Sequence, residues 1–140
     1  MSTEENKANN DAAAKRRAQL RAVANAYFEG LARKDVSAVP YDDNVVLRAP
    51  LAPGGSENPL RGRKAAVDYL TSLFPVLGEV RVIEYYTNEE MTAICTEAFV
   101  GVINPPATLR VADRFTVNTA GQIIEQENHY DPRPALPPGR

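Results

Sequence analysis

The sequence contains few of the residues that form covalent cross-links or bind metal ions. Its 140 residues include one cysteine, Cys95, one histidine, His129, and no tryptophan. A single cysteine excludes a disulfide within the chain, and the apolar run around Cys95 favours a small buried side chain over a catalytic thiol. The chain has no H-x-x-x-H pair and no carboxylates at metal-ligand spacing, so we predict that it binds no metal.

Phosphate loops and long apolar runs are also missing. The Gly54-Gly55 pair lies in a proline-rich stretch rather than between a strand and a helix, and we predict no cofactor. No apolar run approaches the length of a transmembrane helix. The first residues, MSTEENKANND, contain no apolar segment like that of a secretory signal. We therefore expect a cytoplasmic protein that does not bind a membrane.

An excess of charge of one sign is absent as well. The formal net charge is -2, and acidic and basic residues are interleaved. One basic cluster, residues 15–21, falls on a predicted helix, where a solvated face is the expected role. Without a basic stripe, the sequence predicts no binding of nucleic acid.

The chain does contain enough apolar material for one folded domain, since 44% of its residues are hydrophobic. The polar residues 1–11 predict a disordered N-terminal arm. Residues 12–131 carry the regular patterns of a single domain, and the proline-rich residues 132–140 predict a tail that cannot continue a sheet.

Within the domain the pattern changes from helical to strand-like. Apolar residues recur at spacings of three and four over residues 12–33 and 63–74, which predicts two amphipathic helices. A short strand (44–49) and a loop rich in proline and glycine (50–62) separate them. Alternating residues from about 78 onward predict four antiparallel strands, the last two being 108–117 and 122–130. Helices followed by such a meander indicate the α+β class.

One acid breaks the apolar row of the third of these four strands. Side chains alternate along a strand, so Asp113 points to the same face as the apolar Leu109, Val111, Phe115 and Val117. Burial would raise the pKa of this carboxyl and favour its neutral form. Asp113 is therefore either a structural anchor, for example paired with Arg48, or an acid/base group in a pocket.

The last strand also presents two different faces. Gln126, Asn128 and Tyr130 share one face, and the other carries Glu125, Glu127 and His129. The sequence alone does not decide which face is inward, because a bulge would exchange them. His129 and Glu97 therefore remain alternative general bases.

Four stretches, AYFEGLARKD, YDDNVVLRAP, GRKAAVDYL and VADRFTVNTAGQIIEQENHY, give the chain a family resemblance. In this order they resemble the nuclear-transport-factor-2-like (NTF2-like) superfamily, within its ketosteroid-isomerase and SnoaL-like polyketide-cyclase branch. The resemblance implies a cone in which a curved antiparallel sheet wraps around helices and encloses a pocket. It also implies a homodimer formed through the outer sheet face, where Phe99 is a candidate contact.

The resemblance further implies roles for individual residues. Tyr27 matches an oxyanion-hole tyrosine, and Asp113 matches an aspartic acid that is kept protonated to donate a hydrogen bond. The aspartate that serves the family as general base is replaced here by Arg48 and Ala49. Inward-facing Gln126, Asn128 and Tyr130, with Arg48, Phe74 and Phe115, form the predicted substrate-binding set.

These observations predict a cofactor-free acid/base enzyme of the cyclase, isomerase, dehydratase or epoxide hydrolase type. Its substrate would be a hydrophobic oxygenated small molecule, such as a polyketide, terpenoid or steroid-like compound. The alternative is a non-catalytic binding or dimeric interaction module of the same fold, because a fold does not fix a function.

Overall fold

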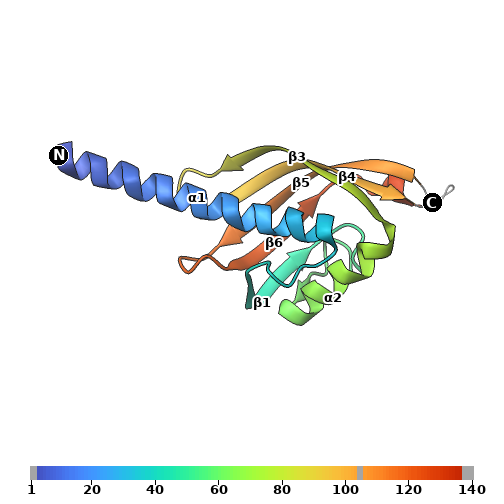
Figure 1. The fold of residues 1–140 in the computed structure, drawn as a ribbon. Helices are drawn as coiled ribbons and strands as arrows, with labels where there is room; N and C mark the ends of the chain where they lie inside the picture. The colour runs from blue at the N-terminus through green and yellow to red at the C-terminus, as the bar shows by residue number, and fades with distance from the viewer. Residues whose placement is uncertain (1–2, 104–105, 137–140) are drawn as a thin grey trace.

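The computed structural model describes residues 3–103 and 106–136, and within them two α-helices lie against one six-stranded sheet (Figure 1). The helices are α1 (Thr3–Arg33) and α2 (Arg63–Leu73), and the short 3-10 helices are η1 (Phe74–Val76) and η2 (Arg133–Ala135). The strands are β1 (Tyr41–Arg48), β2 (Leu60–Arg61), β3 (Leu77–Thr87), β4 (Ala93–Ile103), β5 (Pro106–Val117) and β6 (Ile123–His129).

The sheet has the order β2-β1-β6-β5-β4-β3. The predicted antiparallel meander is confirmed for β3 to β6, and the α+β class is confirmed with it. The sheet as a whole is mixed rather than purely antiparallel, because β1 pairs with β6 in parallel. Strand β2 pairs with β1 on its other side. It has only two residues and lies within the loop rich in proline and glycine, so the sequence shows no alternating pattern there.

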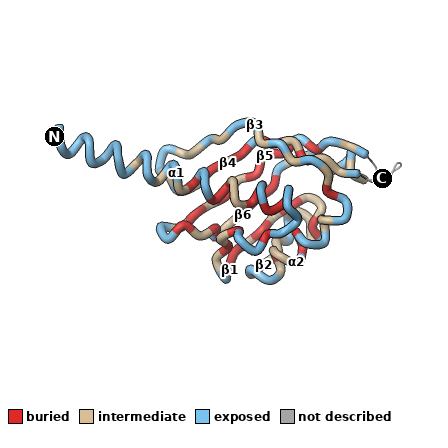
Figure 2. The backbone as a smooth tube through the Cα atoms, in the orientation of Figure 1, coloured by how far each residue is buried: buried red, intermediate tan, exposed pale blue. Residues whose placement is uncertain are grey.

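Helix α1 begins at Thr3, inside the segment predicted to be disordered, and here the structure differs from the prediction. Residues 3–12 are exposed, and Figure 2 shows this half of the helix projecting from the body without a buried face. Its helical state has local causes: Glu4 and Glu5 stand in the first turn, where the helix dipole favours negative charge, and alanines follow at 12–14. Residues 1–2 lie outside the described part.

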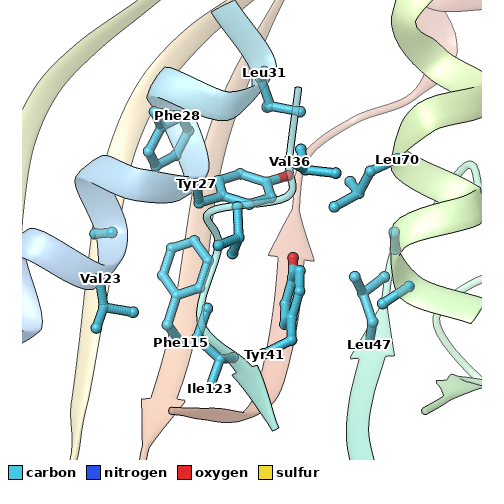
Figure 3. Close-up of a cluster of buried hydrophobic side chains, with 14 of the residues drawn as sticks. Val23, Tyr27, Phe28, Leu31, Val36, Tyr41, Leu47, Leu70, Phe115 and Ile123 are labelled. Carbon is cyan, nitrogen blue, oxygen red and sulfur yellow. The ribbon is translucent and has the colours of Figure 1, made fainter. Parts of the chain in front are cut away.

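The core forms where the second half of α1 lies on the inner face of the sheet. Buried residues of α1 begin at Leu20 and include Tyr27 and Phe28. The Tyr27 ring meets Phe28 and Phe115 edge-to-face, with centroids 4.9 and 5.1 Å apart (Figure 3). Helix α2 packs against β1 on the other side of this aromatic cluster. The sheet thus curves around two helices and leaves room between them.

Arg16 ties α1 to the ends of two hairpins. Its guanidinium donates to the carbonyl oxygens of Met91 (2.9 Å), Asn118 (3.0 Å) and Val117 (2.8 Å). The same group donates to Gln19 Oε1 at 2.6 Å. Arg16 is therefore a structural contact, in contrast to the solvated face predicted for the whole basic cluster.

The proline-rich tail also contributes to the body. η2 lies within it and contacts β5, and residues 137–140 fall outside the description. Residues 104–105, between β4 and β5, are not described either. Neither α1 nor α2 offers a stretch that is both apolar and long enough to cross a bilayer, within the described residues.

Candidate functional site

A cavity of about 170 Å³ lies between α1, α2 and the inner face of the sheet. Five of its wall residues are polar: Tyr27, Tyr69, Asp113, Asn128 and Tyr130. The other ten are apolar: Leu31, Leu51, Leu73, Val76, Leu77, Val100, Val102, Leu109, Val111 and Ala135. An apolar pocket with a few converging polar groups is the usual form of a small-molecule site.

Strand register brings part of this polar set together. Thr96 of β4 and Asn128 of β6 both pair with Asp113 of β5. Directly paired residues point to the same side of a sheet, so the three side chains form a row across the inner face. All three are buried, with 0%, 6% and 3% of their surface exposed for Thr96, Asn128 and Asp113.

Asp113 is a carboxyl without a counter-charge. Among the residues that the structure describes, its Oδ1 atom has no hydrogen-bond partner. Burial raises the pKa of Asp113 well above its usual range, because the charged form loses its hydration. Burial therefore favours the protonated carboxylic acid, a form that can donate one proton and accept a hydrogen bond.

Tyr27 reaches the same cavity from α1. Its ring is fixed by Phe28 and Phe115, and only 3% of the residue is exposed. Burial, and then the nearby Asp113, raise the pKa of Tyr27 well above the ordinary value of a phenol. The hydroxyl stays protonated and is a hydrogen-bond donor.

Gln126 lies in the interior beside the cavity and orients a wall residue. Tyr41 donates its hydroxyl proton to Gln126 Oε1 at 2.6 Å, and Gln126 Nε2 donates to Asn128 Oδ1 at 3.0 Å. Because Oδ1 of Asn128 is occupied in this way, its amide nitrogen is the atom left to donate to a ligand. Tyr41 was not expected in this network, since the sequence predicts that the first strand begins only at residue 44, whereas β1 begins at Tyr41.

Tyr69 is a second wall residue that the sequence analysis did not single out. Its position on α2 follows the same helical spacing as the buried Ala66 and Leu70, so the pattern marks it only as core. Tyr130 lies directly after β6 and lines the cavity together with Tyr69. Burial is the first cause that raises the pKa of both tyrosines, and both hydroxyls stay protonated.

Four residues of the predicted substrate-binding set do not line the cavity: Gln126, which lies behind Asn128, and the three that follow. Arg48 has the strand parity opposite to the buried Leu47 and Ala49, and its Nη1 donates to the carbonyl oxygen of Ser56 at 2.8 Å. Phe115 is fully buried behind Tyr27 as a core residue. Phe74 begins η1 and packs at the edge of the core.

The two alternative bases lie on the opposite face of the sheet. His129 has 53% of its side chain exposed, with Nδ1 3.8 Å from Glu127 Oε2. Glu97 is exposed and accepts a hydrogen bond of 2.5 Å from the Tyr86 hydroxyl. Neither lines the cavity, so Asp113 is the one carboxyl in its described walls. Among the described residues, no three His, Cys, Asp or Glu side chains gather as metal ligands.

Solved structures with the same arrangement are NTF2-like proteins. A steroid delta-isomerase from Pseudomonas aeruginosa is 20% identical and has a TM-score of 0.66, with 82% of this chain and 81% of that one covered. The epoxide hydrolase/cyclase-like enzyme SalBIII, which has a role in pyran ring formation in the polyether salinomycin, is 14% identical with a TM-score of 0.71 (84% and 95% covered). An NTF2-like protein from Anabaena variabilis is 16% identical with a TM-score of 0.67 (81% and 90% covered).

Such identities establish the fold alone, and the predicted NTF2-like fold is confirmed. A comparison with curated protein sequences gives no significant match. A family model described as "Domain of unknown function (DUF8021)" matches residues 13–129.

Proposed function

The chain belongs to the DUF8021 family, and we propose that it is a cofactor-free acid/base enzyme acting on a hydrophobic oxygenated small molecule. One observation carries the proposal: Asp113 is a buried carboxyl with an unpartnered Oδ1 atom in the wall of an apolar cavity. A buried polar atom without a partner costs free energy, so its retention in the fold calls for a functional explanation.

Asp113 and Tyr27 would act on one oxygen atom of the ligand. Both side chains are neutral donors, and together they stabilise negative charge that develops on a carbonyl or epoxide oxygen. Asp113 goes further, since it transfers its proton to that oxygen, and the resulting carboxylate then takes up the proton released by the substrate carbon in an isomerisation or by the attacking water in an epoxide hydrolysis. The amide nitrogen of Asn128, which lines the same cavity, would orient the ligand beside them.

Fold relatives support this chemistry as a class. One is a steroid delta-isomerase, and another is an epoxide hydrolase/cyclase-like enzyme. Reactions of the isomerase, cyclase, dehydratase and epoxide hydrolase types share one need, a neutral acid that protonates or polarises an oxygen in a dry site. The polar residues of the cavity wall, Asp113 above all, would supply that acid.

The test compares Asp113→Asn with the wild-type protein on single-ring probes that match the cavity. Cyclohex-3-en-1-one reports isomerisation to the conjugated enone by absorbance, and cyclohexene oxide reports hydrolysis to the diol. Asparagine keeps a hydrogen-bond donor but cannot transfer a proton, so turnover should fall by about 100-fold or more while binding persists. Tyr27→Phe should also lower turnover, by about 100-fold.

Matched controls are available on the outer sheet face. Glu97→Gln and Tyr86→Phe make the same chemical changes at exposed positions, and both variants should retain wild-type turnover. Turnover that survives both Asp113→Asn and Tyr27→Phe unchanged would refute the proposed mechanism.

A second candidate is a binding protein without turnover. The observation that favours it is the lack of a separate general base among the described wall residues, since an enolisation needs an acceptor for the carbon-bound proton. This reading predicts that the wild-type protein binds the same probes and leaves them chemically unchanged.

A further inference from the structure

Two buried oxygen atoms of the cavity walls lack a hydrogen-bond partner within the described residues: Asp113 Oδ1 and the hydroxyl of Tyr69. Asp113 comes from β5 and Tyr69 from α2, so the two atoms belong to different layers of the fold. Tyr69 is 8% exposed and Asp113 is 3% exposed. The cavity therefore offers a second polar contact in addition to the proposed acid.

Tyr69 does not stand alone in this part of the wall. The neighbouring Tyr130 hydroxyl lies near enough to lower the pKa of Tyr69, against the larger effect of burial, but it does not meet Tyr69 in hydrogen-bond geometry. The backbone of Leu51, from the loop between β1 and β2, acts in the same sense on Tyr130. These hydroxyls are neutral, and each can both donate and accept.

The walls also restrict the charge and size of a ligand. Their described residues include no arginine, lysine or histidine, so a carboxylate ligand would be buried without a counter-charge. A cavity of about 150 Å³ in another protein holds one benzene ring. The 170 Å³ found here therefore fits one substituted ring.

We propose that the pocket takes a neutral one-ring ligand with two oxygen functions, one held by Asp113 and Tyr27 and the other by Tyr69. The inference rests on the proposed function for its first contact, and it adds Tyr69 as the residue that selects for the second oxygen. A purely apolar ring would leave both buried atoms unpaired, whereas a ring with two oxygens satisfies both.

The experiment measures two dissociation constants by calorimetry at neutral pH, one for acetophenone and one for 4-hydroxyacetophenone. The wild-type protein should bind the hydroxylated probe about three- to tenfold more tightly, the effect of one additional neutral hydrogen bond. Tyr69→Phe should reduce that ratio to about one or below, because the added hydroxyl then loses its partner. Tyr86→Phe, an exposed tyrosine on the other sheet face, is the matched control and should keep the wild-type ratio.

A further variant separates this inference from the proposed function. Asp113→Leu removes the first contact and should weaken both probes equally. If it does so while Tyr69→Phe keeps the wild-type ratio, the role of Tyr69 is wrong and the proposed site stands. If Asp113→Leu weakens neither probe, the proposed site is wrong as well. Equal wild-type affinity for the two probes, or no binding of either, also overturns the inference.

Discussion

Asp113 lies within β5, and its neighbours explain why the pKa of its carboxyl is raised. Its cross-strand partners Thr96 and Asn128 are uncharged, and Val111 and Phe115 flank it on the same face. A carboxylate there would lose hydration and gain no ion pair, so the protonated form is favoured and the pKa rises.

Because of this raised pKa, Asp113 lowers the free energy of unfolding by an amount that depends on pH. Below about pH 4 the carboxyl is protonated in both the folded and the unfolded chain. Above that pH the unfolded chain releases the proton while the folded chain keeps it, so the free energy of unfolding falls as pH rises toward the folded-state pKa. The slope from this one group is at most about 1.4 kcal/mol per pH unit.

Asp113→Asn should remove this slope. Urea unfolding of both proteins at about pH 5 and about pH 8 gives the difference directly. We expect the variant to gain stability relative to the wild-type protein as the pH rises, and we expect Glu97→Gln to follow the wild-type curve. A constant difference between variant and wild type would mean that Asp113 ionises normally in the folded state.

At this scale the sequence predicts some site residues and misses others for a physical reason. Asp113 could be predicted as a site residue because it is an acid within a row of apolar side chains. Tyr69 was not visible, because an aromatic on a helical stripe has the same pattern whether it fills the core or lines a cavity. Arg48 was predicted to bind the substrate, but the structure places it outside the cavity. Strand alternation agrees with the structure, because Val45 and Leu47 point inward and Arg48 therefore points to the opposite face.

Among the elements, α1 is attached to the ends of two hairpins by the side chain of Arg16. Arg16 donates to three backbone carbonyl oxygens, from residues 91, 117 and 118, that belong to two different turns. No regular pairing joins the helix to these turns, so the guanidinium provides the polar part of the contact.

Arg16→Ala should therefore lower the free energy of unfolding by about 2–3 kcal/mol, the range for hydrogen bonds to a charged group. Arg17→Ala is the control, since Arg17 is exposed on the next position of the helix, and it should change stability by less than about 0.5 kcal/mol. Chemical denaturation of the three proteins measures the effect. Equal stability of both variants would show that the helix is held by its apolar face alone.

The observed boundaries of the elements agree with the predicted ones where the sequence carries a strong local signal. The hairpin turn at Asn118–Gly121 is formed as predicted, with Gly121 at a φ of 86°, a conformation that favours glycine. The parallel pairing of β1 with β6 could not be predicted in this way, because no local pattern specifies a contact between strands so far apart in the chain. Tyr41 belongs to β1 rather than preceding the first strand for the same reason, since it pairs with Ile123.

For the whole molecule, the outer face of the sheet is the surface on which we propose a homodimer. Phe99 lies there, as the sequence predicts. The Cζ atoms of Arg81 and Arg110 stand 4.8 and 5.3 Å from the centroid of its ring. Tyr86 and Ile103 add exposed apolar surface, at 52% and 54% exposure. Exposed apolar groups within a charged rim favour association with a partner.

Light scattering after size-exclusion chromatography should give twice the chain mass. Tyr86→Glu places a second acid beside Glu97 in the proposed interface, so it should shift the protein toward the monomer. Thr71→Glu adds the same charge on the exposed side of α2 and should leave the mass unchanged. A wild-type monomer at high concentration would rule out the proposed dimer.

The parallel pairing of β1 with β6 also determines when the domain can finish folding during its synthesis on the ribosome. Within the described sheet, β1 has only the two-residue β2 as a partner until Ile123–His129 has been synthesised. Translation at about 5–20 residues per second separates the two strands by several seconds. During that interval the apolar face of β1 has no sheet to join, so the domain completes its fold only as its last strand leaves the exit tunnel.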